Sequence, residues 1–453
     1  MLQSLISKYN QAGPRYTSYP TVPYWDNSSF STDSYLKELK LTFQKSRSLG
    51  ISIYIHLPFC ESLCTFCACH KYITKRHEVE DSYIDAVLQE WKLYVDFLEE
   101  VPCIKEMHLG GGTPTFFSSE NLKRLINGIL SISSLASTHE LSFEAHPNNS
   151  TKEQLHTLFD LGFRRLSFGI QDYGEKVQKA INRIQSFEQV EKVSNWSKEI
   201  GYTSLSHDLV FGLPFQTLEN IKDSIKKTAA LLPDRISLYS YAHVPWIKGV
   251  GQRGFDEKDL PKADEKRILY ETAKSAFKDL GYEEIGMDHF ALKTDSLYQS
   301  TIEKTLHRNF MGYTTNKTQL MIGLGMSSIG DSWGGFAQNI KNVKEYEECV
   351  NAGQFPFFRG HILSEEDKVI RKHILNIMCH FETSWVESEM RFEGLENTIS
   401  HLQEMVNDGL ITVSNNKLIV VEKGIPFVRN VCMAFDLHLL RNQPEKAVFS
   451  MTI

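Results

Sequence analysis

The chain has 453 residues and a formal net charge of −7 at pH 7, and 41% of its residues are hydrophobic. This composition is typical of a folded globular protein and excludes a disordered one. Acidic and basic residues are interspersed, which argues against nucleic acid and anionic membranes as partners. No apolar run reaches the ~20 residues of a membrane-spanning helix, and the N-terminus lacks a signal-peptide pattern, so we expect a cytoplasmic location.

The first 48 residues predict an arm on the main body. Pro14, Pro20 and Pro23 punctuate a segment rich in aromatic residues, among them Tyr16 and Tyr19. Proline disfavours regular structure, whereas aromatic rings favour docking on a folded domain. We therefore expect residues 1–48 to form an irregular, extended N-terminal arm.

Residues 49–345 predict the main domain, because six apolar segments alternate there with helical patterns. The expected strands are 51–56, 104–109, 139–145, 164–170, 203–210 and 235–241, and 283–287 is a further possible strand. Such alternation indicates an α/β fold with a parallel sheet. Six units predict an incomplete parallel (β/α)6 TIM-like barrel, and an open doubly wound sheet would give the same alternation. Polar or glycine-rich residues follow all six strands, which favours the barrel, whose active site forms at those ends.

Residues 346–453 predict a mainly helical C-terminal domain with a small hairpin. The hairpin is expected from 410–413 and 418–421, with a turn at Asn415 and Asn416 between them. Helices combined with a hairpin are typical of a winged-helix-like module. The segment lacks a basic stripe, so we expect it to cover the barrel rather than to bind DNA.

A loop rich in cysteine directly follows the first expected strand. Cys60, Cys64 and Cys67 have C-x3-C-x2-C spacing, and Cys69 comes two residues later. Thiolates in one loop select zinc or an iron–sulfur cluster. Zinc usually takes its fourth ligand from a second pair of ligands, and no such pair follows. The spacing therefore favours a four-iron cluster that leaves one iron without a protein ligand.

The cysteine loop resembles that of radical S-adenosylmethionine (SAM) enzymes. Within these enzymes, the string from Tyr54 to Cys69, the arm segment 15–21 and the segment 307–310 are similar to the oxygen-independent coproporphyrinogen III oxidase family, also called coproporphyrinogen dehydrogenase. The resemblance extends from Arg15 to beyond Asp436. The chain departs from the family pattern in having Ala68 for glycine, His70 for asparagine and Met311 for glutamine.

The resemblance implies two kinds of cofactor. A [4Fe-4S] cluster would be held by Cys60, Cys64 and Cys67, and Cys69 would act in catalysis without binding the cluster. Two SAM molecules would be bound, and the matching positions are Tyr54, Phe66, Gly111, Gly112, Thr113, Glu144, Gln171, Arg183, Asp208, Ala242 and Ile329. Independently of the family, Glu144 and Asp208 interrupt apolar strands, where an unpaired charge is costly and a cavity-facing role is favoured.

The resemblance also implies a reaction. A 5′-deoxyadenosyl radical derived from SAM would start the anaerobic oxidative decarboxylation of two propionate groups of coproporphyrinogen III to vinyl groups, giving protoporphyrinogen IX in haem biosynthesis. An electron donor such as flavodoxin or ferredoxin and an electron acceptor of unknown identity would take part, and we expect a monomer. The candidate contacts for the propionates are Arg15, Lys71, Arg76, His307 and Arg308.

Two related functions are the alternatives. One is a haem chaperone of the same radical SAM subfamily, and the other is a radical SAM methyltransferase with a related barrel. Haem chaperones of this kind lack the Tyr-Thr-Ser-Tyr-Pro arm and typically lack a cysteine at the position of Cys69. The arm, Cys69 and the His307–Phe310 segment favour the oxidase over both alternatives.

Overall fold

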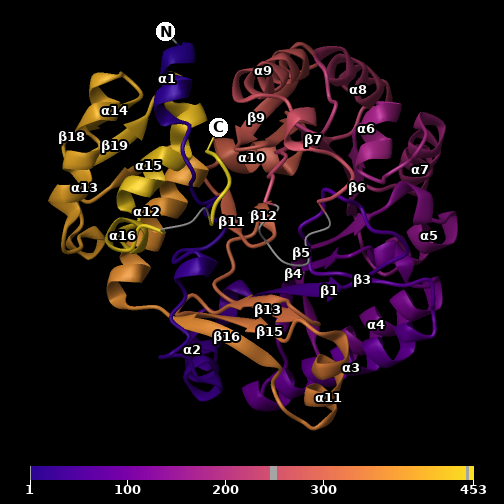
Figure 1. The fold of residues 1–453 in the computed structure, drawn as a ribbon. Coiled ribbons are helices and arrows are strands. Elements are labelled where there is room, and N and C mark those ends of the chain that lie inside the picture. The colour runs from indigo at the N-terminus through magenta and orange to yellow at the C-terminus, as the bar shows by residue number, and fades with distance from the viewer. Residues whose placement is uncertain (1, 245–251, 445–447, 453) are drawn as a thin grey trace.

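The computed structural model describes residues 2–244, 252–444 and 448–452 (Figure 1). Its centre is one sheet with the strand order β16-β15-β14-β13-β1-β4-β5-β6-β7-β8-β10-β9. The six expected strands are present and are neighbours in parallel pairing: β1 (Ile51–Leu57), β4 (Cys103–Gly111), β5 (Ser134–Ala145), β6 (Arg165–Gln171), β7 (Ser204–Phe211) and β8 (Arg235–Ser240). The expectation of an α/β fold with a mainly parallel sheet is confirmed.

The sheet extends beyond those six strands at both edges. β13 (Met321–Leu324) pairs in parallel with β1, and antiparallel strands follow: β14 (Ile329–Asp331), β15 (Gly335–Asn339) and β16 (Phe357–Ile362). At the other edge, β10 (His289–Leu292) and β9 (Tyr282–Gly286) are also antiparallel. The two edge strands β9 and β16 do not pair with each other, so the sheet stays open.

Helices cover the outer side of the arc that the strands form (Figure 1). They are α3 (Val79–Leu98), α4 (Ser119–Ser131), α5 (Lys152–Asp160), α6 (Glu175–Ala180), α7 (Phe187–Ile200), α8 (Leu218–Leu231), α9 (Ala263–Asp279) and α11 (Val343–Asn351). Thr151 and Gln154 have the spacing of a capping box in the sequence and form that box at the start of α5, and Ser186 caps α7. Trp91 of α3 is fully buried and donates its indole N–H to the carbonyl of Ile129 in α4 (3.1 Å). The apolar faces of these helices and the sheet form the main hydrophobic core.

The N-terminal arm contains two helices that the sequence pattern did not predict. α1 (Leu2–Tyr9) packs Leu5, Ile6 and Tyr9 into the core of the C-terminal part, and α2 (Thr32–Lys45) contacts β15 and β16. The segment between them is largely irregular, as expected, and buries Tyr16 and Tyr19. The prolines that suggested an irregular arm lie only in its middle. The apolar faces of α1 and α2 pack into two different hydrophobic cores, so the arm is an integral part of the fold.

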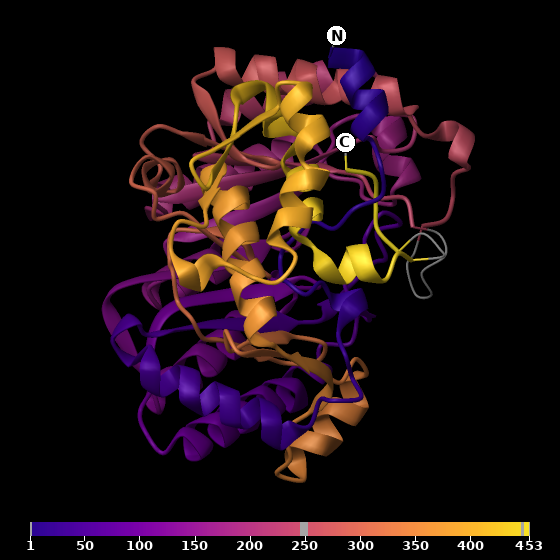
Figure 2. The ribbon, with the colours of Figure 1, turned by 90° about the vertical axis from the view of Figure 1, so that its left-hand side faces the viewer.

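The C-terminal part has its own hydrophobic core. Its helices are α12 (Glu365–His380), α13 (Leu395–His401), α14 (Gln403–Asn407), α15 (Val428–Phe435) and α16 (Leu437–Arg441), and Figure 2 shows α12 and the yellow C-terminal helices in front of the sheet. The expected hairpin is β18 (Ile411–Ser414) with β19 (Lys417–Val420), and β17 (Glu382–Ser384) adds a third strand.

The expected domain boundary at residue 346 lies inside α11, which packs against α3 of the main domain. β16 then adds a further strand to the main sheet before α12 begins. We therefore propose that the C-terminal domain begins after β16. Three further short elements are α10 (Ser296–Ile302) and the hairpin of β11 (His307–Asn309) and β12 (Gly312–Thr314). Among the described residues, no helix is both long and apolar enough to cross a membrane.

Candidate active site

The cysteine loop is fixed at its base by a pair of very short strands. β2 (Phe59–Cys60) and β3 (Tyr72–Ile73) pair in parallel, and the amide of Thr74 donates to the carbonyl of Cys60 (2.9 Å). Phe59 is buried against the rings of Phe116 and Phe117. The loop therefore leaves and re-enters the body at one rigid point beside the carboxyl end of β1.

Cys60, Cys64 and Cys67 all line one small cavity of about 220 Å³ at the carboxyl ends of the parallel strands. This cavity also contains most of the residues expected to bind SAM: Phe66, Gly111, Gly112, Thr113, Glu144, Gln171, Arg183 and Asp208. These residues come from the cysteine loop and from segments that follow or end β4, β5, β6 and β7. Parallel pairing brings these strand ends to the same edge of the sheet, as in parallel barrels in general.

The three thiols fit a metal cluster better than a single ion. Ligands of one tetrahedral zinc lie roughly 3.8 Å apart. Among the described residues, the one group of histidine, cysteine, aspartate or glutamate ligand atoms that all lie within 4.8 Å of one another is His361, Asp367 and His438. The sulfur atoms of the loop are thus spread more widely than a single zinc requires, which favours the expected iron–sulfur cluster.

Positive groups surround the cysteine loop. The guanidinium Nη1 of Arg183 lies 3.7 Å from the Sγ of Cys64, and Lys71 donates to the carbonyls of Cys67 and Cys69 (both 3.2 Å). Cations favour thiolate over thiol, which is the form that binds iron. Burial raises the pKa of the Cys60 thiol to about 11, so coordination to a metal would have to supply the driving force for losing that proton.

The glycine-rich turn after β4 packs directly on the end of β1. Gly112 donates its amide to the carbonyl of Leu57 (2.8 Å), and a Cβ on Gly112 would lie 2.4 Å from the carbonyl oxygen of Pro58. Gly111 has a φ of +114°, which disfavours any side chain. Next in the chain, the hydroxyl of Thr113 lies 3.3 Å from the Sγ of Cys60. The glycines are therefore needed for backbone packing, and they also leave the cavity wall free of side chains.

Two carboxylates line the small cavity, Glu144 near the end of β5 and Asp208 within β7. Glu144 accepts from the amide of Gly111 (3.3 Å) and lies 3.5 Å from the Nε2 of His108. Asp208 is on β7, where burial raises the pKa of its carboxyl to about 6, against the lowering effect of hydrogen bonds from Ser237 and Ser167. Both residues interrupt apolar strands, and both line the cavity, as that pattern predicted.

Gln171 and Arg183 close the side of the small cavity. Gln171 ends β6 with a φ of +70°, a strained conformation for a residue with a side chain. Arg183 donates to the carbonyl of Gly169, while its Nε is buried without a partner among the described residues. A Cβ on Gly169 would lie within 3 Å of both side chains, so this glycine is required for their placement.

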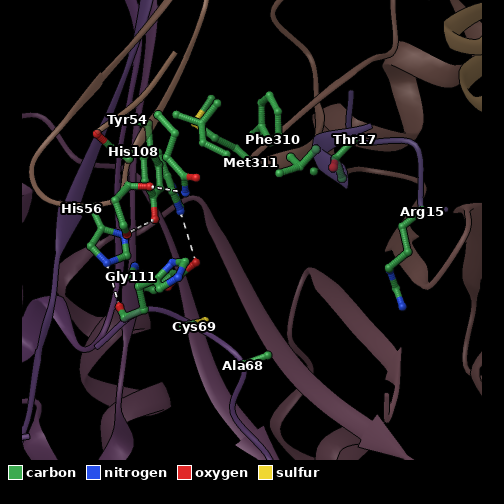
Figure 3. A pocket seen from close by; sticks show the side chains of 18 of the residues that line it. Arg15, Thr17, Tyr54, His56, Ala68, Cys69, His108, Gly111, Phe310 and Met311 are labelled. Carbon is green, nitrogen blue, oxygen red and sulfur yellow. Dashed lines mark hydrogen bonds and ion pairs between the residues drawn. The ribbon is translucent and has the colours of Figure 1, made fainter. Parts of the chain in front are cut away.

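A second, larger cavity of about 570 Å³ adjoins the first. Two of the expected SAM residues, Tyr54 and Ile329, line this cavity alone, and Figure 3 shows Tyr54, His56 and His108 close together on its wall. His56 donates from Nε2 to the carbonyl of His70 (2.9 Å), so its Nδ1 accepts from the hydroxyl of Tyr54 (3.1 Å). Burial lowers the pKa of His56, which keeps this tautomer neutral.

The two cavities share one wall, formed by Cys69, Gly111, Glu144 and Tyr239. Cys69 is exposed to this space, and a hydrogen bond between the thiols of Cys67 and Cys69 raises the pKa of the latter. Of the propionate candidates, Arg15 and Arg308 line the larger cavity, and Arg15 lies across it from Gly111 (Figure 3). All three departures from the family pattern, Ala68, His70 and Met311, line the same cavity.

Four expected site residues lie elsewhere. Lys71 lines the small cavity rather than the large one, and Arg76, His307 and Ala242 line neither. Ala242 is half-buried, and its carbonyl accepts from Gln252 (2.8 Å). The sequence analysis also missed residues of the large cavity: His56, His108, Tyr239, His289, Gln338 and Arg359. For His56 a signal existed, because residues two apart on a strand share a face, and Tyr54 was already a candidate.

Comparisons with known proteins identify the relatives of this chain. The model of the Radical SAM superfamily matches residues 54–228. The chain is 37% identical to the oxygen-independent coproporphyrinogen III oxidase of Helicobacter pylori over 444 residues, 96% of each chain, and 34% identical to that of Escherichia coli over an alignment of 460 residues, 99% of this chain and 98% of the relative. A solved structure of coproporphyrinogen III oxidase from Escherichia coli, described as a radical SAM enzyme, has a TM-score of 0.89 and 33% identity and covers 96% of this chain and 99% of that one.

Proposed function

The chain belongs to the oxygen-independent coproporphyrinogen III oxidase family, and we propose on this premise that it converts coproporphyrinogen III to protoporphyrinogen IX in anaerobic haem biosynthesis. It is a radical SAM oxidoreductase. Two propionate groups of the substrate become vinyl groups, each with loss of carbon dioxide. The identity to the oxidases covers nearly the whole length of the chain, including the arm and the C-terminal part.

The observation that carries this proposal is the shared wall between the two cavities. The small cavity contains the three cysteines of the C-x3-C-x2-C motif, and the large cavity contains the arginines that suit carboxylate groups. The residues of this wall would therefore lie between the cofactors in the small cavity and a substrate in the large one. We place the transfer of reactivity at Cys69, Gly111, Glu144 and Tyr239.

Cys60, Cys64 and Cys67 would hold a [4Fe-4S] cluster, and the glycine turn, Glu144, Gln171, Arg183 and Asp208 would bind SAM. The cluster and SAM supply the one-electron chemistry that generates a 5′-deoxyadenosyl radical. We propose two SAM molecules, because the expected contacts divide between chambers: most line the small cavity, whereas Tyr54 and Ile329 line only the large one. Ala242 remains a proposed contact outside both cavities.

The protein's own side chains orient the bound molecules and exclude water. Tyr54 and His56 form a neutral hydrogen-bonded pair on the wall of the large cavity. A neutral pair presents no competing charge to a radical reaction. Glu144 accepts from the amide of Gly111 with one carboxylate oxygen, and its other oxygen, 3.5 Å from the Nε2 of His108, would also accept from an ammonium or hydroxyl group of SAM. We propose that Cys69 acts at the wall without ligating the cluster.

The partners and setting are also proposals. A reductase such as flavodoxin or ferredoxin would reduce the cluster, and an acceptor of unknown identity would take the final electron. All eight cysteines are free thiols, which supports a reducing, cytoplasmic location. We propose a monomeric enzyme whose catalytic unit is an incomplete (β/α)6 barrel together with its N-terminal arm.

Anaerobic reconstitution tests the proposed function. The protein is loaded with iron and sulfide and incubated with SAM, a reductant, an artificial electron acceptor and coproporphyrinogen III. The expected products are 5′-deoxyadenosine, carbon dioxide and protoporphyrinogen IX, with two molecules of carbon dioxide per tetrapyrrole. Cleavage of SAM without any tetrapyrrole product would contradict the oxidase assignment, and transfer of a methyl group to the tetrapyrrole would indicate the methyltransferase alternative.

A further inference from the structure

Arg308 is a buried cation in the wall of the large cavity. It lies on β11, opposite Tyr313 of β12, and only 4% of its surface is exposed. Its guanidinium stacks on the ring of Tyr313 at 4.5 Å, and its Nη2 donates a long hydrogen bond to the carbonyl of Arg15 (3.4 Å). Its Nε and Nη1 have no hydrogen-bond partner among the described residues, and no described carboxylate pairs with it.

The other three buried arginines are all saturated with acceptors. Arg235 binds the carboxylate of Asp295 (2.7 Å) and the hydroxyl of Ser296, and Arg371 pairs with Asp331. Arg429 has no carboxylate partner but donates to three backbone carbonyls, those of Gly13, Pro14 and Met451. The fold thus satisfies its buried guanidinium groups wherever they serve structure. Arg308 is the exception in the described residues, and it is the one that lines the cavity.

The surroundings of Arg308 carry an excess of positive charge. The nearby carboxylate, Asp288, is already paired with Arg15 from the N-terminal arm. Burial lowers the pKa of Lys266 to about 8, and the charge of Arg15 adds to the effect. Burial likewise lowers the pKa of His289 to about 4, and the charge of Arg308 acts in the same direction. A buried cation without an opposite charge is costly, so this region is poised for an anion.

We infer that Arg308 is the anchor that binds a propionate carboxylate of the tetrapyrrole. This inference rests on the proposed function, and it selects one residue among several basic groups in the cavity. Arg15 is already neutralised by Asp288, and Arg359 already donates to Gln338 (2.8 Å). The unpaired Nε and Nη1 of Arg308 have almost no access to water, so the cation lacks both solvent and an opposite charge. A carboxylate that reaches the guanidinium from the cavity would supply that charge and at least one charge-assisted hydrogen bond.

If Arg308 binds a carboxylate of the substrate, Arg308→Met should lose affinity for coproporphyrinogen III. This affinity should fall by roughly thirtyfold or more, as for loss of one partner of a desolvated charge pair. Arg308→Lys keeps the positive charge but loses the planar guanidinium, so its affinity for the substrate should lie between those of the wild type and Arg308→Met. Arg76→Met is the matched control, because Arg76 is exposed and lines neither cavity. Cluster content and binding of SAM should be unchanged in all three variants.

The decisive readout compares the free acid with the neutral methyl ester of the same tetrapyrrole. Binding is measured by anaerobic equilibrium dialysis of the reconstituted protein, with the tetrapyrrole oxidised afterwards for detection by fluorescence. The wild type should prefer the acid, and Arg308→Met should lose most of that preference, which a mere packing defect would not cause. An unchanged acid-to-ester ratio in both Arg308 variants overturns the inference. If the wild type prefers the acid but forms no protoporphyrinogen, the proposed function fails and the carboxylate site stands.

Discussion

The guanidinium of Arg15 forms an ion pair with Asp288, which lies in the turn between β9 and β10. This contact joins the N-terminal arm to the edge of the sheet across 273 residues of sequence. The arm is also held by Arg429 and by a backbone bridge between Ala12 and Met451 near the C-terminus. The N-terminal arm, which lines the large cavity with Arg15, Thr17 and Val22, is thus joined to the sheet edge and to the C-terminal segment.

Breaking the Arg15–Asp288 pair should weaken the arm. Asp288→Asn is expected to lower the free energy of unfolding by about 1–2 kcal/mol, between the values for exposed and for fully buried pairs. A double-mutant cycle with Arg15→Met, read by chemical denaturation, should give a clear coupling energy. The exposed pair Lys40–Glu99 is the control, for which the coupling should be close to zero. Equal coupling energies for the two pairs would contradict an anchoring role.

Each of the three motif cysteines should be required for the cluster. Cys60→Ser, Cys64→Ser or Cys67→Ser removes one thiolate, so iron and sulfide content and SAM cleavage should all be lost. Cys69→Ala should keep the cluster largely assembled and yet impair formation of protoporphyrinogen, because Cys69 lies in the wall between the cavities. Full turnover of Cys69→Ala would indicate that Cys69 only packs beneath the loop. Loss of the cluster in this variant would indicate that Cys69 is a cluster ligand.

Asp208 should make the binding of SAM depend on pH. Burial raises the pKa of its carboxyl to about 6, so the ionised form that attracts a cationic or hydroxyl-bearing ligand grows in as the pH rises through 6. The affinity of the wild type for SAM should therefore rise between pH 5 and 7, and Asp208→Asn should bind more weakly and without that dependence. Isothermal titration at several pH values checks this. Glu144→Ala should also weaken SAM binding, with cluster content near normal.

Ionisation of Asp208 should strengthen SAM binding but lower the stability of the protein without SAM. The folded pKa of this carboxyl lies above its unfolded value of 3.8, so its contribution to stability is complete below pH 3.8 and is lost as the pH rises toward 6. In Asp208→Asn this loss should be absent. Thermal unfolding without SAM, followed from pH 4 to pH 7, measures the difference. A wild-type profile that matches that of the variant would contradict the burial of this carboxyl.

The ion pair of His438 on α16 with Asp367 on α12 should stabilise the packing of these two helices. Burial alone would lower the pKa of His438, but the hydrogen bond and charge of Asp367 (2.7 Å) raise it. A raised histidine pKa gives stability that is complete below about pH 6.5 and is lost as the pH rises through the folded pKa. His438→Gln should remove this pH dependence between pH 6 and 9 in chemical denaturation. The exposed His139→Gln is the matched control and should unfold like the wild type.

The repeating pattern of the chain was sufficient to predict the main elements. Six apolar segments matched the six central parallel strands, because a buried parallel strand must be apolar on both faces. The capping residues Thr151 and Ser186 marked helix starts, since unpaired amides at a helix N-terminus select such side chains. The cysteine spacing and the carboxylates in apolar strands likewise predicted residues that line the small cavity, because both features are local and chemically costly without a ligand.

Contacts between distant segments could not be predicted in the same way. β13 to β16 are short, and their place beside β1 depends on pairing with a strand more than 260 residues earlier. Likewise α1 packs in the C-terminal core, and β16 returns to the main sheet after the expected boundary. Local periodicity specifies which face of a segment is apolar but not which other surface covers that face.

The sequence by itself determined the strand–helix alternation, the cysteine loop and the two carboxylates in apolar strands, since each of these follows from patterns within one segment. The other expected residues of the small cavity came from the resemblance to the family. The tertiary structure alone decided which basic residues could serve the substrate. Arg15 and Arg308 were equivalent candidates by sequence, but folding gives Arg15 a carboxylate partner in Asp288 and leaves Arg308 without one. Whether a buried cation is satisfied depends on every segment that packs around it, and that information exists only after the chain has folded.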